Sequence, residues 1–236
     1  MKKLSVLSTV ILILFISSCK KVIGEGALVT ETRTTANFDA VESQISGNIT
    51  YVQSPDFKVE ISAQQNILDV METPVINNRL VVRFRNNVRV KSHEQITTIV
   101  KAPSISSITS SGSGDVNVLG PLNGNNLVFK LSGSGSINLP VLTCQYLEST
   151  ISGSGDISIA GGTADTEHLK ISGSGSINAQ NILAKSATTT ISGSGSMKVS
   201  ASETLNATIS GSGSVYYWGR PVVSTDISGS GKVIHQ

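Results

Sequence analysis

The sequence contains few of the residues that most often carry chemistry. It has two cysteines and three histidines in 236 residues, and aromatic residues make up 4% of it. Cys144 is the only cysteine outside the N-terminal segment, so no disulfide can form within the body of the chain. Because no basic residue or histidine stands next to it, Cys144 is predicted to be a small buried apolar residue rather than a reactive thiol.

The low charge argues against a catalytic or metal site. From Lys101 onward the chain has seven acids and seven bases, and the three histidines are scattered. No Gly-x-Ser-x-Gly stretch stands at a strand-to-helix elbow with downstream Asp and His. We therefore predict no catalytic residue, no metal and no cofactor. The alternative is a β-helix enzyme that acts on polysaccharide, and three or more ionisable groups on adjacent coils would favour it.

What the sequence has in abundance is the motif Ser-Gly-Ser-Gly, which occurs seven times. The copies begin at Ser111, Ser132, Ser152, Ser172, Ser192, Ser210 and Ser228, at spacings of 18 to 21 residues. Self-similarity at a period near 20 residues is typical of stacked repeats. A flexible linker could have the same composition, but it would not be flanked by isoleucine at fixed spacing.

Alternation around the motif predicts strands. Ile151, Gly153, Gly155 and Ile157 share one face, and the serines between them share the other. Twenty residues are too few for a βαβ unit but suit one coil of a solenoid with stacked isoleucines as its core. Inward glycines then mark places where neighbouring coils leave no room for a Cβ. The predicted fold class is all-β, a parallel β-helix-like solenoid of roughly 20-residue coils.

Calcium binding is not expected from the repeat. Only two of the seven positions that follow the motif are acidic, Asp115 and Asp156. These two lie two coils apart, about 10 Å. Calcium–oxygen distances are about 2.4 Å, so one ion cannot bridge them.

Residues 1–18 are predicted to be a lipoprotein signal peptide. Two lysines precede an apolar run, from Val6 to Ile16, that is too short to span a bilayer as a permanent helix. The run ends in small residues directly before Cys19, which resembles a bacterial lipobox. Cys19 is therefore the predicted lipidation site and membrane anchor. The alternative is an ordinary secretory signal with an incidental cysteine.

This segment also sets the expected charge and location of the mature protein. Without residues 1–18 the chain has 16 Lys and Arg against 16 Asp and Glu, since two lysines and no acid are lost. This balance argues against nucleic acid as a partner. We expect an outer-membrane lipoprotein of the cell envelope. Lys20 and Lys21 directly after Cys19 favour an orientation that faces the periplasm over exposure at the cell surface.

Patterning divides the rest of the chain into three parts. Residues 19–36 are polar and threonine-rich and are predicted to be a tether. Residues 37–103 are strand-like without the full motif, so we predict degenerate coils there. Within them, Ile45–Ile49 looks like a degraded copy of the motif, and Gln64–Met71 contains a short helix. Residues 104–236 carry the intact repeats and complete one predicted solenoid.

Basic residues form the first candidate for ligand contact. Arg83, Arg85, Arg89 and Lys91 alternate with apolar residues on both sides of a turn at 86–87. They are predicted to project from one side of a hairpin. They could bind an anionic glycan or lipid headgroups, or they could form a solvated strand face that protects a sheet edge.

The aromatic pair Tyr217 and Trp218 is the second candidate. Aromatic rings can stack on sugars, and they can also cover the open end of a solenoid. We favour the covering role, and with it a monomer that is protected against end-to-end association. Partners other than the membrane would then be a glycan or another envelope protein.

The order of these features resembles a known family. Phe38-Asp39-Ala40-Val41, the Ile45–Ile49 strand, Asn66-Ile67-Leu68 and the Ser-Gly-Ser-Gly-x-Ile-Asn units together resemble the head GIN domain family of auto-transporter adhesins, over roughly residues 38–236. The resemblance implies a right-handed parallel β-helix-like fold in cell-envelope proteins of Bacteroidetes-type bacteria, many of them lipoproteins. It implies no catalytic residue. The predicted function is a non-catalytic binding, adhesion or structural role on a lipid-anchored β-solenoid.

Overall fold

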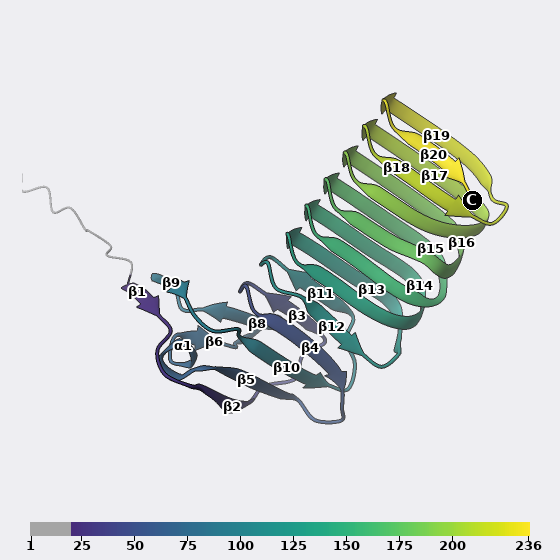
Figure 1. Cartoon of the computed structure of the whole chain (residues 1–236). Helices are drawn as coiled ribbons and strands as arrows, with labels where there is room; N and C mark the ends of the chain where they lie inside the picture. The colour runs from purple at the N-terminus through teal and green to yellow at the C-terminus, as the bar shows by residue number, and fades with distance from the viewer. Residues whose placement is uncertain (1–19) are drawn as a thin grey trace, which may run out of the picture.

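The chain folds into a β-solenoid, which Figure 1 shows from the side. The structure is a computed structural model and describes residues 20–236. The solenoid has about six turns with coils of roughly 20 residues, so the predicted all-β class and coil length are confirmed. Parallel pairing in register joins each coil to the next, and Ile151 lies opposite Leu131 on one side and Ile171 on the other.

The regular part of the stack extends from residue 107 to residue 235. Its strands are β11 (Ser107–Ser110), β12 (Val116–Leu119), β13 (Leu122–Gly133), β14 (Ser136–Gly153), β15 (Asp156–Gly173), β16 (Ser176–Gly193), β17 (Ser196–Gly211), β18 (Ser214–Trp218), β19 (Val222–Gly229) and β20 (Lys232–His235). β14, β15 and β16 each follow nearly a whole coil without interruption, whereas the first and last coils are divided into shorter strands (Figure 1).

Apolar side chains at the inward positions fill the solenoid and stack on their copies in neighbouring coils. Ile151, Ile171 and Ile191 form one fully buried column, and Ile157 and Ile177 belong to a second. The inward face predicted from alternation is therefore confirmed. Each Å² of apolar surface that these columns remove from water contributes about 25 cal/mol, and a single coil could not bury them alone.

The glycines of the motif form a corner at which successive coils pass in close contact. Gly153 and Gly173 have φ angles of +140° and +133°, which residues with a Cβ rarely adopt. A Cβ on Gly173 would also collide with the carbonyl oxygen of Gly153 in the preceding coil. The prediction that these glycines leave no room for a side chain is confirmed.

The first part of the chain contains ten further strands and one short helix. They are β1 (Lys20–Ile23), β2 (Leu28–Thr34), β3 (Ala40–Ser43), β4 (Asn48–Gln53), β5 (Lys58–Gln64), α1 (Gln65–Leu68), β6 (Met71–Glu72), β7 (Val75–Ile76), β8 (Arg79–Phe84), β9 (Val88–Ser92) and β10 (Thr97–Ala102). The helix confirms the prediction within Gln64–Met71, because Ile67 and Leu68 are buried in the core.

Residues 37–103 do not form the successive degenerate coils that we predicted. β3 lies between β8 and β11, and β4 lies between β10 and β12, all of them parallel. The coil of residues 40–53 is therefore enclosed between a coil built from residues 79–102 and one built from residues 107–119. β5 runs antiparallel to β2 and to β10 instead of joining the stack.

The reason for this difference is that residues 54–106 have apolar alternation but no Ser-Gly-Ser-Gly corner. Without glycines that let coils pass at close distance, the chain reverses in turns. Asn77, Asn78 and Asn87 supply positive φ angles in this region, which asparagine tolerates better than most residues.

The degraded motif copy at Ile45–Ile49 is nevertheless in register with the first intact copy. Ile49 lies opposite Val116, and a Cβ on Gly112 would collide with the carbonyl oxygen of Ile45. Positions 46 and 111 are 65 residues apart in sequence, yet they lie in neighbouring coils. The chain between them forms the coil on the other side of residues 40–53 and then passes back to the side where residue 111 lies.

The predicted tether over residues 19–36 is wrong for most of its length. β1 pairs in parallel with β9, and Val22 is buried in the core. β2 pairs antiparallel with β5, since its threonines favour an extended backbone. The described chain is therefore folded from its first residues onward. Cys19 and the predicted signal peptide lie outside the described residues, and within the described ones no helix has the length and apolar character needed to cross a membrane.

Candidate functional site

The predicted basic cluster is divided between two strands that do not pair with each other. β8 pairs with β3, β6 and β7, whereas β9 pairs with β1 in a separate two-stranded sheet. The turn at 86–87 is present, and the amide of Val88 donates to the carbonyl oxygen of Arg85 at 3.3 Å. Beyond this turn the hairpin prediction is wrong, because Val90 lies opposite Val22 of β1 and both pack on the core.

Arg83 and Arg85 are engaged by an acidic residue within the protein. Their guanidinium nitrogens lie 3.3 and 3.5 Å from the carboxylate oxygens of Glu72. Arg85 also donates to the carbonyl oxygen of Asp69 at 3.1 Å. Partly exposed ion pairs of this kind stabilise a fold by about 0–1 kcal/mol. They nevertheless reduce the positive charge that these two side chains offer to a ligand.

Arg89 and Lys91 differ, because they are exposed on β9 while Val88 and Val90 pack on the core. No carboxylate within residues 20–236 lies at ion-pair distance from either cation. These two residues are the accessible part of the predicted cluster.

Tyr217 and Trp218 do not cover the open end of the stack. Both belong to β18, which pairs with β17 on one side and with β20 on the other. The ring of His235 in β20 lies 4.9 Å from the ring of Tyr217. The last strand therefore stacks over β18, and the covering role that we predicted is wrong because Tyr217 and Trp218 stay in a strand that β20 covers instead of folding over the final copy.

The acidic positions after the motif bind the neighbouring coil. Oδ1 of Asp115 accepts hydrogen bonds from the amide and the hydroxyl of Ser136, at 3.1 and 2.8 Å. Asp156 accepts the same pair from Ser176, at 3.2 and 2.6 Å. These carboxylates therefore join successive coils. Among the described residues, no three His, Cys, Asp or Glu side chains gather in a way that could hold a metal ion.

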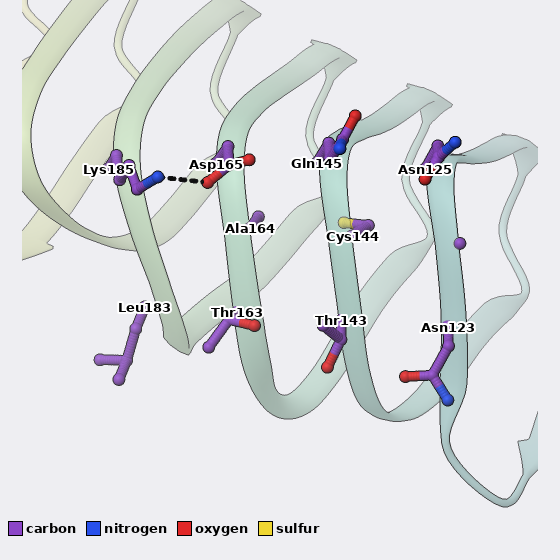
Figure 2. Close-up of a pocket in the computed structure, with 11 residues that line it drawn as sticks. Asn123, Asn125, Thr143, Cys144, Gln145, Thr163, Ala164, Asp165, Leu183 and Lys185 are labelled. Atoms are coloured by element: carbon purple, nitrogen blue, oxygen red, sulfur yellow. Dashed lines mark ion pairs between the residues drawn. The ribbon is translucent and has the colours of Figure 1, made fainter.

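A groove that the sequence did not predict runs along the stack across β13 to β16, with a volume of about 730 Å³ (Figure 2). Its floor consists of small residues at one position in successive coils, Gly124, Cys144 and Ala164. Ala184 and Ala201 continue this floor into a second hollow of about 430 Å³. Four coil intervals make the floor about 19 Å long. We call this surface the axial groove.

Polar side chains line both walls of the axial groove, as Figure 2 shows. One wall carries Asn123, Thr143 and Thr163, one from each coil, and ends at Leu183. The opposite wall carries Asn125, Gln145, Asp165 and Lys185. Each of these residue types is ordinary for a solvated strand. The polar rows can be recognised only when residues that are 20 positions apart are placed side by side, so the sequence alone did not predict them.

The amides and hydroxyls of these walls form no side-chain hydrogen bonds with other described residues. Polar rows elsewhere on the surface do pair internally. Asn138 donates to Asn117 at 3.0 Å, and Asn181 donates to the carbonyl oxygen of Ala160 at 3.2 Å. The axial groove therefore presents donors and acceptors that are available to a ligand.

The axial groove carries little net charge. Its acid and its base form an ion pair, in which Nζ of Lys185 lies 2.7 Å from Oδ1 of Asp165 (Figure 2). The predicted buried thiol of Cys144 is confirmed at the floor. Burial, together with the charges of Glu167 and Asp165, raises the pKa of Cys144 to about 11. The thiol is therefore protonated at neutral pH and is a poor nucleophile.

Glu167 occupies a core position in β15, two residues after Asp165. It is fully buried between Leu147 and Ala187, and neither carboxylate oxygen has a hydrogen-bond partner among the described residues. Burial raises the pKa of Glu167 to about 8. The alternation that places Leu169 inward also places Glu167 inward, so the sequence contained the signal for this residue.

Ionisable side chains also gather on the outer face of β13, β14 and β15. They are Lys130, Glu148, His168 and Lys170, which we call the flat-face cluster. Glu148 pairs with Lys130 at 3.1 Å, and the ring of His168 lies 5.1 Å from that of Tyr146. The low charge of this part of the chain therefore does not prevent ionisable groups from gathering on adjacent coils, which is the arrangement that would favour the enzyme alternative. The adjoining hollow of about 190 Å³ is lined by one carboxylate, whereas glycoside hydrolysis generally requires two.

These features define the class of protein: a β-solenoid whose side carries an open groove with polar walls. The chain belongs to the family described as putative auto-transporter adhesin, head GIN domain, whose model matches residues 37–221. The family resemblance predicted from the sequence is confirmed.

Three solved structures are similar to this chain over most of its length. A putative adhesin from Bacteroides fragilis is 26% identical with a TM-score of 0.84, covering 91% of this chain and 100% of that chain. A putative lipid binding protein from Parabacteroides distasonis is 23% identical with a TM-score of 0.78, covering 92% and 100%. A putative adhesin from Parabacteroides merdae is 23% identical with a TM-score of 0.77, covering 92% and 99%. The last two show a shared fold alone. No curated protein matches this chain.

Proposed function

We propose that this chain is a non-catalytic binding protein of the cell envelope, anchored through a lipid on Cys19, with the axial groove as its ligand site. The observation that carries the proposal is the groove itself, in which unpaired amides or hydroxyls stand on the walls of three successive coils, β13 to β15, above a floor of small residues. Membership in an adhesin family supports an envelope location. The lysines directly after Cys19 support an orientation towards the periplasm.

The ligand class that fits the axial groove best is a linear, uncharged polysaccharide. Amide side chains offer both donors and acceptors, which match sugar hydroxyls. A polymer that lies along the stack meets amides or hydroxyls in three successive coils, β13 to β15. The volume falls within the range of about 300–1,000 Å³ that is usual for ligand sites.

An acyl chain fits this surface less well, although one structural neighbour is described as a putative lipid binding protein. An acyl chain in the groove would strip water from the amides and hydroxyls of the walls without replacing their hydrogen bonds. Each such loss costs about 1–3 kcal/mol.

The test is calorimetric binding of neutral polysaccharides selected on a glycan array. Asn125→Ala combined with Gln145→Ala removes two amides from one wall. At about 1 kcal/mol for each net hydrogen bond, the double variant should bind roughly 30-fold more weakly. The matched control is Tyr146→Ala combined with His168→Ala on the adjoining flat face, which should bind like the parent. Loss of binding in the control alone would place the ligand on the flat face instead.

A second candidate function is an activity on acidic polysaccharide at the flat-face cluster. It is favoured by one observation, the gathering of Lys130, Glu148, His168 and Lys170 on adjacent coils. The test is the release of shortened products from a uronate polymer, compared between the parent and His168→Ala. If the parent releases no products, the non-catalytic role is retained.

A further inference from the structure

We infer that the outer face of the β1–β9 sheet is a contact surface for a membrane with anionic lipid headgroups. The surface is formed by Lys21, Ile23, Arg89 and Lys91. This inference rests on the proposed function for its position at the membrane, since that position requires the lipid on Cys19.

The strand register brings the basic side chains together. Lys21 lies opposite Arg89, and Val22 lies opposite Val90. Side chains alternate across a strand, and the two valines pack on the core. Lys21, Arg89 and Lys91 are therefore on the outer face, where all three are exposed.

An apolar side chain accompanies these cations. Ile23 ends β1 with 54% of its surface exposed. A surface that combines exposed cations with an exposed aliphatic group is suited to the interface between headgroups and acyl chains.

Charge is distributed unevenly along this sheet. The strands are parallel, so Lys21 and Arg89 lie side by side towards the end where residue 19 enters, and Lys91 lies farther along β9. The nearest carboxylates in sequence, Glu25 and Glu94, come only after each strand has ended. No ion pair within the described residues involves Lys21, Arg89 or Lys91. The end of the sheet that faces the proposed anchor is thus positive.

The distance to the anchor is short enough for this charge to matter. Lys21 is two residues from Cys19, which an extended chain spans in about 7 Å. The Debye length at 0.1 M salt is about 10 Å, so headgroups beside an acylated Cys19 interact with these cations. A lysine or arginine close to an anionic bilayer contributes about 1 kcal/mol to membrane binding.

Contact at this surface would also orient the molecule. Figure 1 shows β1 and β9 at the end of the molecule opposite the C-terminal coils, with β13 to β16 farther along the stack. A membrane at the β1–β9 sheet therefore leaves the axial groove clear of the bilayer and open to a ligand.

The test uses residues 20–236 without lipid, because this segment contains every described strand and the whole described core. Binding to sedimenting vesicles is measured with phosphatidylglycerol mixed into phosphatidylcholine, and with phosphatidylcholine alone. Arg89→Glu combined with Lys91→Glu should weaken binding to the anionic vesicles by roughly 30-fold or more, since two cations are lost. Added salt should weaken the parent in the same direction.

The matched control is Lys198→Glu combined with Lys232→Glu, which makes the same change of net charge on exposed residues of β17 and β20. This control should bind anionic vesicles like the parent. Equal loss in both double variants, or no binding by the parent, would overturn the inference. If residues 20–236 bind anionic vesicles as expected but Cys19 of the full chain carries no lipid in cells, only the proposed anchor is contradicted.

Discussion

Glu167 is a single core residue whose burial has a consequence for stability. Its pKa is about 8 in the folded protein and 4.5 for an unperturbed glutamate, because burial disfavours the charged form. Between these two values the native state holds a proton that the unfolded state has released. The free energy of unfolding therefore falls as pH rises from about 4.5 to about 8, and the contribution is fully lost above the folded pKa.

Glu167→Leu should remove this dependence and stabilise the protein. Leucine matches Leu147 of the neighbouring coil at the same position. The gain in Tm over the parent should be larger at pH 8 than at pH 5, because the parent alone is weakened by ionisation. Thermal denaturation across this pH range measures it, with the exposed Glu203→Leu as control. A gain that does not change with pH would mean that Glu167 ionises normally.

Gly173 offers a second test at the scale of a residue. Gly173→Ala should destabilise the protein, because alanine is strained at a φ of +133° and its Cβ would meet the carbonyl oxygen of Gly153. Backbone strain of this kind costs about 1–3 kcal/mol. Ser174→Ala, at the exposed neighbouring position, should change the urea midpoint little. Similar midpoints for the two variants would show that the corner tolerates a side chain.

At the scale of the element, the strands are stabilised by columns rather than by contacts within one coil. Ile171 lies between Ile151 and Ile191, so each isoleucine is buried by its copies. The outward serines contribute little to this core. Because each coil repeats the same alternation, a short stretch of sequence is enough to identify the inward face of every repeated coil.

Ile171→Asp should therefore unfold the protein or lower its Tm strongly. The substitution places an unpaired charge in a fully buried column, which costs several kcal/mol. Ser174→Asp, on the exposed face, should melt close to the parent in the same calorimetric scan. If both variants lose the same stability, the inward register assigned to the strand is incorrect.

The elements that could be predicted from the sequence are the strands that pair with another copy of the same repeat. β14 to β16 follow from a local repeat, and their register requires only the spacing of the motif. β1 and β2 were missed because their partners, β9 and β5, are distant in sequence and share no motif with them. The pairing of Arg83 and Arg85 with Glu72 depends on the same distant arrangement. The axial groove was missed because its walls combine single residues from successive coils.

At the scale of the whole molecule, the position of β1 at the start of the described chain changes how an anchor would act. β1 begins at residue 20, so a lipid on Cys19 would hold the folded body directly at the bilayer. The coils would then extend from a fixed base, and the axial groove would lie at a defined height above it.

Cys19→Ala should abolish acyl labelling and leave unprocessed precursor. The reason is that Cys19 supplies the thiol to which the lipid would attach, directly after the small residues at 17 and 18. Metabolic labelling with a radioactive fatty acid, followed by electrophoresis, measures both effects. The control Cys144→Ala should be labelled and processed like the parent, and labelling that survives in Cys19→Ala would contradict the anchor.

The equivalence of neighbouring coils has a consequence for inheritance. Coils that carry the motif in the same register, such as those of Ile151 and Ile171, offer nearly the same strand surface to the coil before them and to the coil after them. An in-frame duplication or loss of one repeat in the gene would therefore be accommodated without a new fold. The C-terminal coils would move by about 4.8 Å, and β1 to β10 would be unaffected. Repetitive DNA gains and loses units readily during replication, so the length of the groove can evolve in single steps while the end nearest Cys19 stays the same.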